Sequence, residues 1–218
     1  MSTQADANLR ERLAHVYWMG GSPCAGKSST ASLLSGQFGL KIYSCDDAHD
    51  AHVKRAQPDS HPTIFRSTGS SWDEIWMRPV ESMAEAEIQF YREEFELITE
   101  DLLALPADAP VLAEGSALLP QCVAPLLLRP HQSIWVVPSE EFQREQYARR
   151  EWVAGILEQC QNPDAAFQNW MGRDAEFARR VTREAGERAL RVLEVDGSRS
   201  ISETSQTVAA HFNLDARV

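Results

Sequence analysis

Gly21-Ser22-Pro23-Cys24-Ala25-Gly26-Lys27-Ser28 decides the fold, because this stretch matches the phosphate-binding pattern G-x-x-x-x-G-K-[ST] at every fixed position. Backbone N–H groups, a lysine and the positive end of a helix together offset the closely spaced charges of a triphosphate. We expect Gly21 and Gly26 to let the loop amides approach phosphate oxygens without a Cβ in the way. Lys27 is expected to reach the β- and γ-phosphates, and the Ser28 hydroxyl to bind Mg²⁺.

The residues on either side of this loop fit a strand before it and a helix after it. Residues 15–19 are short, aromatic and β-branched, which is typical of a buried strand. A helical pattern begins at Ser28 and ends near Phe38 and Gly39. A phosphate loop requires both neighbours, so the context favours a nucleotide site over a Gly- and Ser-rich loop without a ligand. This site is predicted to comprise Gly21, Ser22, Pro23, Cys24, Ala25, Gly26, Lys27, Ser28 and Ser29.

The composition indicates the broad class of protein. The chain has 218 residues, 43% hydrophobic and 24% charged, which fits a single α/β domain over residues 1–218 with a helical lid or small insertion. A net charge of −11 argues against nucleic acid as a partner, because binding to a phosphate backbone requires a basic face. No apolar run has the length of a membrane span, and the first residues lack the apolar core of a signal peptide. Four widely spaced cysteines indicate reduced thiols, so we expect a cytoplasmic monomer or homodimer that acts on a small molecule, without nucleic-acid or membrane partners.

Hydrophobic periodicity predicts strands that alternate with helical segments, as in a parallel sheet wrapped by helices through right-handed crossovers. The longest predicted helix starts after Pro79, and its apolar residues recur at three- and four-residue steps as far as Leu102. Its glutamates, Glu93 and Glu94 among them, are interpreted as a solvated face. The predicted strands lie near 15–20, 40–44, 110–114, 132–137 and 190–195.

Carboxylates follow the second and third predicted strands, at the edge where open parallel sheets bind ligands. We expect Asp46 or Asp47 to accept a proton from an acceptor hydroxyl, or to orient that hydroxyl for in-line attack. Asp46 is preferred as the catalytic residue, because one of the two aspartates is also suited to cap the following helix. Glu114 is the predicted Mg²⁺-organising acid, together with Ser28; the alternative is that it marks the exit of its strand to solvent.

Arginines cluster after the fourth predicted strand. Arg149 and Arg150 are expected to bridge the charge that spreads over the transferred phosphoryl oxygens, because planar guanidinium groups suit that task. The alternative is that these arginines form ion pairs with Glu145 and Glu151 on the surface. A second basic cluster offers further candidates to close over the nucleotide, namely Arg173, Arg179, Arg180 and Arg183.

These features resemble the P-loop small-molecule kinases of the adenylate, uridine, nicotinamide-riboside, gluconate and shikimate kinase type. The phosphate loop carries the specific part of the resemblance, and element order extends it over most of the chain. The resemblance implies a three-layer P-loop NTPase fold, with a five-stranded parallel sheet in the order 2-3-1-4-5 between helices and an arginine-rich lid at about 141–180. It also implies that Asp46 or Asp47 engages the acceptor and that Glu114-Gly115 match the E-G pair of the uridine-kinase branch.

Two further sites follow from the resemblance. The loop after the fifth strand contacts adenine in such kinases, which points to Gly197 and Arg199; an Asp-Gly turn leading into a helix capped by Ser200 or Ser202 accounts for the same letters. Acceptor recognition comes from about 46–92, where the candidate substrate contacts are Asp46, Asp47, Arg66 and Arg78, with Glu114 beyond it. Further candidates, which suit hydrogen-bonded or core positions equally well, are His49, His52, His61, Trp72 and Trp76.

We therefore expect an enzyme that uses ATP and Mg²⁺ to transfer the γ-phosphate to a hydroxyl of a small metabolite, nucleoside or similar compound. The sequence lacks an obvious matched set of arginines for an acceptor phosphate, which favours a hydroxyl. A nucleoside monophosphate kinase is the first alternative, in which Arg66 or Arg78 would be essential for the acceptor. A nucleotide-dependent switch or ATPase lacks support from an N-K-x-D motif or a clear Walker B strand, and a degenerate binding protein would not need Lys27, Ser28 and both acids.

Overall fold

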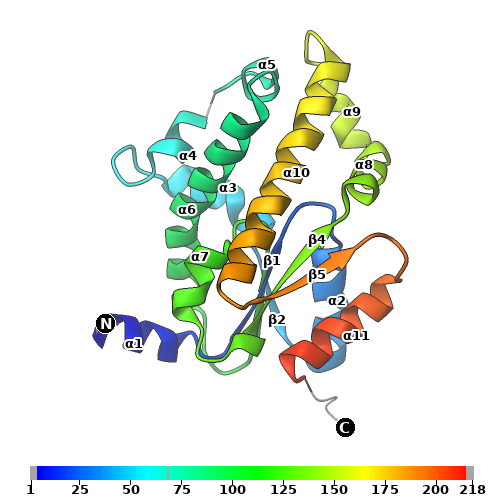
Figure 1. Ribbon diagram of the computed structural model, residues 1–218. Helices are drawn as coiled ribbons and strands as arrows, with labels where there is room; N and C mark the ends of the chain where they lie inside the picture. The colour runs from blue at the N-terminus through cyan, green and yellow to red at the C-terminus, as the bar shows by residue number, and fades with distance from the viewer. Residues whose placement is uncertain (1–3, 68, 215–218) are drawn as a thin grey trace.

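The computed structural model describes residues 4–67 and 69–214, and the sheet it contains is the predicted one (Figure 1). All strand pairs in the described chain are parallel, and the order is β2-β3-β1-β4-β5. Each strand lies within one residue of its predicted bounds at either end. The fold class expected from the sequence is therefore confirmed, strand order included. The strands are β1 (Val16–Gly21), β2 (Lys41–Ser44), β3 (Val111–Glu114), β4 (Ser133–Pro138) and β5 (Arg191–Val195).

Helices cover both faces of the sheet. In Figure 1, α2 (Lys27–Phe38) and α11 (Ile201–Phe212) lie on one face, while the 25-residue helices α6 (Val80–Ala104) and α10 (Pro163–Glu187) lie on the other. The predicted start of α6 after Pro79 and the end of α2 before Gly39 are confirmed. The remaining helices are α1 (Gln4–Arg12), α3 (Cys45–Arg55), α4 (Pro62–Ser67), α5 (Trp72–Trp76), α7 (Pro120–Val123), α8 (Glu140–Ala148) and α9 (Glu151–Leu157), with 3₁₀ turns η1 (Ala124–Leu126) and η2 (Pro130–Gln132).

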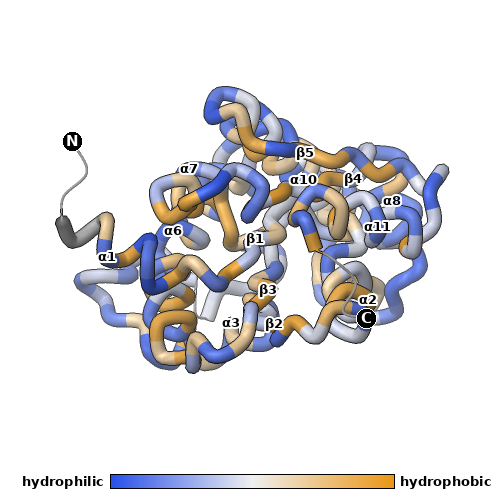
Figure 2. Tube along the Cα trace, turned by 90° about the horizontal axis from the view of Figure 1, so that it is seen from below, coloured by the Kyte–Doolittle hydropathy of each residue, from blue (hydrophilic) through white to orange (hydrophobic). Residues whose placement is uncertain are grey.

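The central strands β1, β3 and β4 are buried on both faces, which explains why they are almost continuously hydrophobic, whereas the edge strands β2 and β5 are partly exposed. Trp135 of β4 packs toward α6 and α10, whereas the next residue, Val136, packs toward α2 and α11. Successive side chains of a strand point to opposite faces, so a central strand with helices on both sides needs apolar residues at nearly every position. Hydrophobic segments accordingly gather along the strands at the centre of Figure 2.

A third apolar cluster joins the predicted lid to the predicted acceptor region. Trp76 of α5 stacks on Trp170 of α10, with ring centroids 4.2 Å apart and planes 12° apart. Met83 of α6 and Tyr147 of α8 belong to the same cluster, and so does Cys24 of the phosphate loop. Offset stacking of two aromatic rings adds roughly 0.5–1.5 kcal/mol to their burial. The helices on either side of the phosphate loop are therefore fastened to each other and to the loop.

The interpretation of the α6 glutamates as a solvated face is wrong for two of them. Glu93 and Glu94 are only 6% and 2% exposed, because α3 and α4 pack on that side of α6. Glu93 accepts hydrogen bonds from the backbone N–H groups of Thr63 (2.7 Å) and Ile64 (3.0 Å) in α4. A buried carboxylate is tolerated only when its oxygens find such donors.

None of the helices in the described ranges combines the length and the apolar character needed to cross a membrane.

Candidate functional site

The phosphate loop connects β1 to α2, as predicted. Cys24 and Gly26 adopt left-handed backbone conformations, with φ of 65° and 76°. Anion-binding concavities of successive N–H groups are built from such residues, and α2 presents its positive N-terminus directly after them. Gly26 is the N-cap of α2 and supplies no side-chain acceptor to the first amides of the helix. The end of α2 is thus arranged to receive an external anion.

Gly21 serves the sheet rather than the turn of the loop. It is the last residue of β1, paired with Val136 of β4 at a φ of 128°. A Cβ on Gly21 would lie 1.9 Å from the carbonyl oxygen of Val136. Gly21 was expected to let the loop amides approach phosphates, but its place in β1 requires a glycine because β4 packs against it. Gly26, in contrast, lies in the turn of the loop.

Lys27 is held over the loop by hydrogen bonds and by nearby carboxylates. Its ammonium donates to the backbone oxygen of Ser22 (2.8 Å) and to the hydroxyl of Ser116 (3.3 Å), and the residue is only 7% exposed. Burial lowers the pKa of Lys27, and the negative charges of Glu114 and Asp46 act against that shift. Lys27 is therefore a buried cation whose charged form is favoured by the nearby acids Glu114, at the end of β3, and Asp46, at the start of α3.

Glu114 lies beside Lys27 at the carboxyl end of β3, where it is 2% exposed. The alternative that it merely marks the exit of the strand to solvent is wrong. Burial raises the pKa of Glu114 and Asp46 raises it further, while Lys27 and hydrogen bonds with Ser28 and Ser44 lower it. Glu114 and Ser28, the two residues predicted to organise a metal, thus contact each other directly.

The donors at this position suit a hard cation. A serine hydroxyl and a carboxylate are oxygen ligands of the kind that Mg²⁺ takes, and Mg²⁺ commonly uses only one or two carboxylates, with water and substrate phosphates as its other ligands. Within residues 4–67 and 69–214, no group of three or more His, Cys, Asp and Glu side chains forms a metal cage. Ser28 and Glu114 therefore fit a cation shared with a phosphate better than a closed protein site.

The two aspartates after β2 are separated by the fold. The Ser44 hydroxyl accepts the backbone N–H of Asp47 (3.2 Å), so this serine, and neither aspartate, caps α3. Asp46 lines a cavity of about 270 Å³ that also includes His49 and Tyr91, whereas Asp47 does not line it. Asp46 is also near enough to Lys27 and Glu114 to shift the pKa of both. The preference for Asp46 over Asp47 agrees with this placement.

Gln143 of α8 anchors the phosphate loop, and sequence reasoning missed it. Its side-chain amide donates to the Ser22 hydroxyl (3.2 Å) and to the Pro23 carbonyl oxygen (3.0 Å), and the residue is 2% exposed. A glutamine in an amphipathic helix carries no signal that would single it out. Cys24, next in the loop, is a packed thiol whose pKa burial raises to about 11, which makes it a poor nucleophile.

The structure brings one of the two predicted lid arginines toward the loop. Arg150 lies over the rings of Tyr147 and Trp152, with its guanidinium carbon 5.4 and 5.8 Å from their centroids, and it is close enough to Cys24 to oppose the rise in the pKa of that thiol. Arg149 instead points to solvent and lies 3.7 Å from Glu145, with 70% of its side chain exposed. The ion-pair alternative thus describes Arg149 in this structure.

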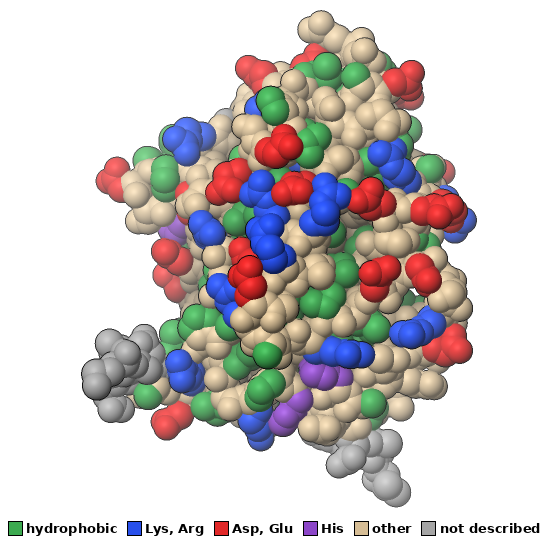
Figure 3. Space-filling view, viewed as in Figure 1, with side chains coloured by type: hydrophobic (Ala, Val, Ile, Leu, Met, Phe, Trp, Pro, Cys, Tyr) green, Lys and Arg blue, Asp and Glu red, His purple; other side chains and the backbone are tan. Residues whose placement is uncertain are grey.

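The arginines of the second basic cluster, all in α10, form ion pairs with neighbouring Asp and Glu side chains. Arg173 is buried between Glu87 of α6 and Asp174. In Figure 3, Lys and Arg side chains over α10 are interleaved with Asp and Glu side chains. These pairs tie α10 to α6 and α8, and they do not direct a guanidinium to the phosphate loop, contrary to expectation. The other pairs are Arg179 with Glu140 and Glu176, Arg180 with Glu85 and Glu176, and Arg183 with Glu187.

The start of α11, directly after the loop that follows β5, lies against the phosphate loop. A Cβ on Gly26 would come 2.8 Å from the Ile201 side chain, which follows this loop. Gly197 (φ 85°) packs against Phe142 of α8, and the loop including Arg199 lines a small cavity of about 110 Å³. Ser200 is the N-cap of α11, as one of the two predicted alternatives had it. Gly197 thus packs on α8 and Arg199 lines a cavity formed by its own loop, while Ile201 makes the contact with Gly26.

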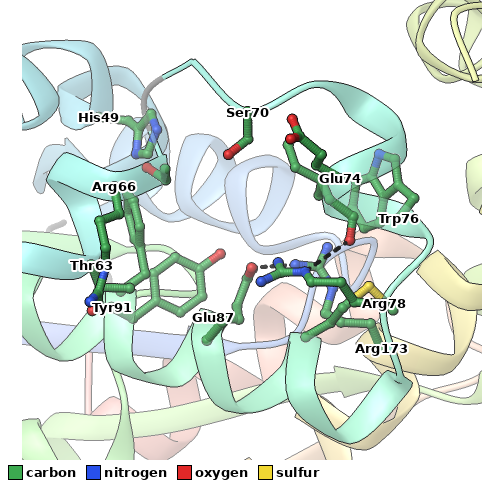
Figure 4. A pocket seen from close by; sticks show the side chains of 15 residues that line it. His49, Thr63, Arg66, Ser70, Glu74, Trp76, Arg78, Glu87, Tyr91 and Arg173 are labelled. Atoms are coloured by element: carbon green, nitrogen blue, oxygen red, sulfur yellow. Dashed lines mark hydrogen bonds and ion pairs between the residues drawn. The ribbon is translucent and has the colours of Figure 1, made fainter.

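The predicted acceptor region encloses the larger pocket, of about 520 Å³. Arg66 of α4 and Arg78 after α5 both line it. In Figure 4, Arg66 comes from one side of this space and Arg78 and Arg173 from the other, while the Glu87 carboxylate and the Tyr91 hydroxyl point into it. His49 and Tyr91 also line the cavity that contains Asp46, so the two spaces adjoin. The cavity lined by Asp46 and the pocket lined by Arg66 and Arg78 thus lie next to each other, with His49 and Tyr91 on their common border.

The described chain combines an α/β fold of strand order 2-3-1-4-5 with a phosphate-binding sequence between β1 and α2. No protein-family model matches the chain, and no curated protein matches it by sequence. The assignment of activity therefore depends on the site alone.

Proposed function

We propose that this protein is a phosphotransferase that uses ATP and Mg²⁺ to phosphorylate a hydroxyl of a small metabolite, nucleoside or similar compound. The observation that carries the proposal is the convergence of a buried lysine and three oxygen ligands at the carboxyl edge of the sheet. Lys27 and Ser28 come from the phosphate loop, and Asp46 and Glu114 from the ends of β2 and β3. A pocket of about 520 Å³, large enough for a small molecule, adjoins the Asp46 cavity.

The roles of these side chains follow from their placement. The Lys27 ammonium offsets charge on the β- and γ-phosphates from a buried position, where an oriented charge acts more strongly than in water. Asp46 accepts the hydrogen bond of the acceptor hydroxyl and aims its oxygen at the γ-phosphorus. Ser28 and Glu114 hold Mg²⁺, which supplies stabilisation of charge on the phosphate oxygens. Most of the rate enhancement then comes from positioning and electrostatics.

Acceptor-dependent ADP release with Mg-ATP tests the proposal. The panel contains nucleosides, sugars, sugar acids, vitamins, hydroxylated antibiotics and nucleoside monophosphates. We expect at least one hydroxyl compound to raise ADP release well above slow hydrolysis of ATP alone, and Lys27→Ala to remove the increase. Two results would contradict the phosphotransferase proposal. One is ATP binding with no acceptor that raises ADP release, and the other is ATP binding that controls the association of this chain with another protein.

A nucleoside monophosphate kinase is a second candidate, and the pocket favours it in one respect. Arg66 and Arg78 line the same space, and among the described residues neither guanidinium pairs with a carboxylate. Arginine is well suited to bind a phosphate through two parallel hydrogen bonds. A monophosphate as the best acceptor, with KM raised strongly in Arg66→Gln or Arg78→Gln, would identify this candidate instead of a neutral hydroxyl acceptor.

Asp46→Asn should reduce phosphoryl transfer by about a hundredfold while ATP affinity stays nearly unchanged, because misplacement of a reacting group by about 1 Å costs that much. The measurement is kcat with the acceptor at saturation, beside a direct titration of ATP binding. Asp47→Asn is the matched control, since Asp47 lies outside the cavity that Asp46 lines. Equal losses of transfer and ATP binding would remove Asp46 from the acceptor side of the site.

A further inference from the structure

Acids and imidazoles alternate along a row of side chains between α3 and α6. Asp101 Oδ2 lies 2.9 Å from His52 Nε2, and His52 Nδ1 lies 3.1 Å from Glu94 Oε1. The same Glu94 oxygen lies 3.0 Å from His49 Nδ1. The row begins at the surface, where Arg55 pairs with Asp101, and ends at His49 in the acceptor pocket.

The middle of the row is buried and fully hydrogen-bonded. His52 has no exposed surface, and Glu94 is 2% exposed. Burial disfavours the charged form of His52, but hydrogen bonds to Glu94 and Asp101 outweigh it and raise the pKa of His52. With a carboxylate against each nitrogen, the ring is held as an imidazolium that donates in both directions. This cation keeps Glu94 ionised, which the lowered pKa of Glu94 also reflects.

His49 ends the row in a different environment. Its side chain is 43% exposed, and its ring stacks on Phe90 with centroids 5.5 Å apart. The bond from Nδ1 to Glu94 fixes the tautomer in which the other nitrogen, Nε2, is the acceptor of the neutral ring. No described residue hydrogen-bonds to Nε2, and His49 lines both the large pocket and the Asp46 cavity. The ring thus offers a basic nitrogen to whatever occupies those spaces.

A purely structural role explains only part of this arrangement. A tie between α3 and α6 accounts for His52 and Glu94, whose partners are all supplied by the protein. It does not require a second imidazole on the same carboxylate oxygen, at a place open to the pocket. Asp46 lies three residues before His49 on α3, so the two side chains share a face of that helix and line one cavity. One turn of helix therefore presents a carboxylate and an imidazole together.

We infer that His49 is the general base of the reaction and that Glu94 and His52 are its positioning residues, an inference that rests on the proposed phosphotransferase function. The acceptor oxygen forms a bond to the γ-phosphorus, and the bond from that phosphorus to the bridging oxygen of ADP breaks. The hydroxyl proton moves to Nε2 of His49 and leaves to solvent after product release. Before the transfer the hydroxyl donates its one hydrogen bond to Asp46, which holds the oxygen in line. In the transfer step that hydrogen bond turns to Nε2 of His49, which takes the proton, and Asp46 stays ionised.

The charged groups around His49 predict how the rate depends on pH. The hydrogen bond to Glu94 of α6 raises the pKa of His49, burial lowers it, and the nearby Asp50 and Asp46 of α3 raise it again, so that the net shift is upward from 6.5. Arg66 of α4 and Tyr91 of α6 share the pocket. A base works in its deprotonated form, so kcat should fall as the pH drops through this raised pKa.

His49→Gln and Glu94→Gln separate the base from its support. We expect His49→Gln to lower kcat by about a hundredfold, the usual size of a lost general base, and to abolish the acid limb of the kcat profile. Glu94→Gln keeps the imidazole but removes the charge beside it, so the acid limb should move to lower pH. His131→Gln is the control. His131 lies in η2 at the N-terminal end of β4, whereas the candidate site lies at the C-terminal ends of the strands, so this variant should leave kcat and its pH profile unchanged.

The outcomes distinguish this inference from the proposed function. Lys27-dependent turnover that persists in His49→Gln with an unchanged pH profile would overturn the role of His49 and leave the phosphotransferase standing. No Lys27-dependent turnover with any acceptor would overturn both. A histidine-ring NMR titration of the Lys27→Ala protein gives a second test that does not depend on how Glu94→Gln folds. A pKa of His49 at or below 6.5 there would also contradict the role assigned to Glu94.

Discussion

Lys27→Ala should lower acceptor-dependent ADP release by about a thousandfold or more, equivalent to about 4 kcal/mol of transition-state stabilisation. The reason is that Lys27 is a buried cation in the phosphate loop, 2.8 Å from the Ser22 carbonyl oxygen, where no solvent charge can replace it. The substitution takes the nearby cation away from the buried Glu114, so we expect some loss of stability. The fold should survive, because Glu114 can bind a proton more readily and keeps its hydrogen bonds with Ser28 and Ser44. The measurement is steady-state turnover, with circular dichroism and thermal unfolding to verify the fold.

Two further variants control for volume and for charge. Lys27→Met keeps most of the aliphatic side chain, so it should be as inactive as Lys27→Ala and at least as stable. Lys41→Ala removes an exposed lysine that pairs with Asp108 at the start of β2, away from the phosphate loop, and should retain full activity. Wild-type turnover in Lys27→Met would mean that the reaction does not use the phosphate loop.

Gly21→Ala should destabilise the protein by about 4 kcal/mol or more, which is a large part of the roughly 5–15 kcal/mol that stabilises an ordinary domain. A Cβ at this position would lie 1.9 Å from the Val136 carbonyl oxygen and 2.8 Å from its nitrogen, both backbone atoms that cannot rotate away. The φ of 128° adds strain for any residue with a side chain. To accept the methyl group, β1 and β4 must separate where Gly21 pairs with Val136. Urea denaturation of the purified variant, or its recovery as soluble protein, measures the loss.

Gly36→Ala is the matched control for this substitution. Gly36 lies inside α2, is exposed, and has no atom within 4 Å of the position where a Cβ would stand. Because alanine favours the helical conformation over glycine by about 1 kcal/mol, this variant should be as stable as the wild type or more stable. A wild-type unfolding midpoint for Gly21→Ala would show that β1 and β4 do not approach as closely as described.

The sequence predicted the central strands well because β1, β3 and β4 are buried on both faces, although β2 and β5 at the edges are only partly buried. The apolar run Ile134-Trp135-Val136-Val137 is short and rich in β-branched and aromatic residues, which favours a buried strand over a helix. The phosphate loop was equally clear, since its glycines, lysine and serine stand at fixed spacing between such a strand and a helix. The order of the strands came from a resemblance and is now confirmed by the pairing of β1 with β3 and β4.

The predictions for charged side chains were less successful, because the order of charges along the chain does not show which groups they contact in the folded protein. Glu93 and Glu94 looked like members of a solvated face, but α3 and α4 cover them and supply their donors. The arginines of α10 looked like ligands for phosphate, but the acids of α6 and α8 occupy them. In each case the deciding contact joins residues far apart in the chain.

The sequence by itself determined the sheet, the phosphate loop and the acids at the ends of β2 and β3, because these depend on local periodicity and on short motifs. Only the tertiary structure decided which of those acids lie near Lys27 and that Gln143 anchors the loop. It also decided that His49, hydrogen-bonded to Glu94, lines the pocket that contains Arg66 and Arg78. The physical reason is that a buried charge or hydrogen bond is stable only when a specific partner is brought to it, and packing between helices distant in sequence chooses that partner.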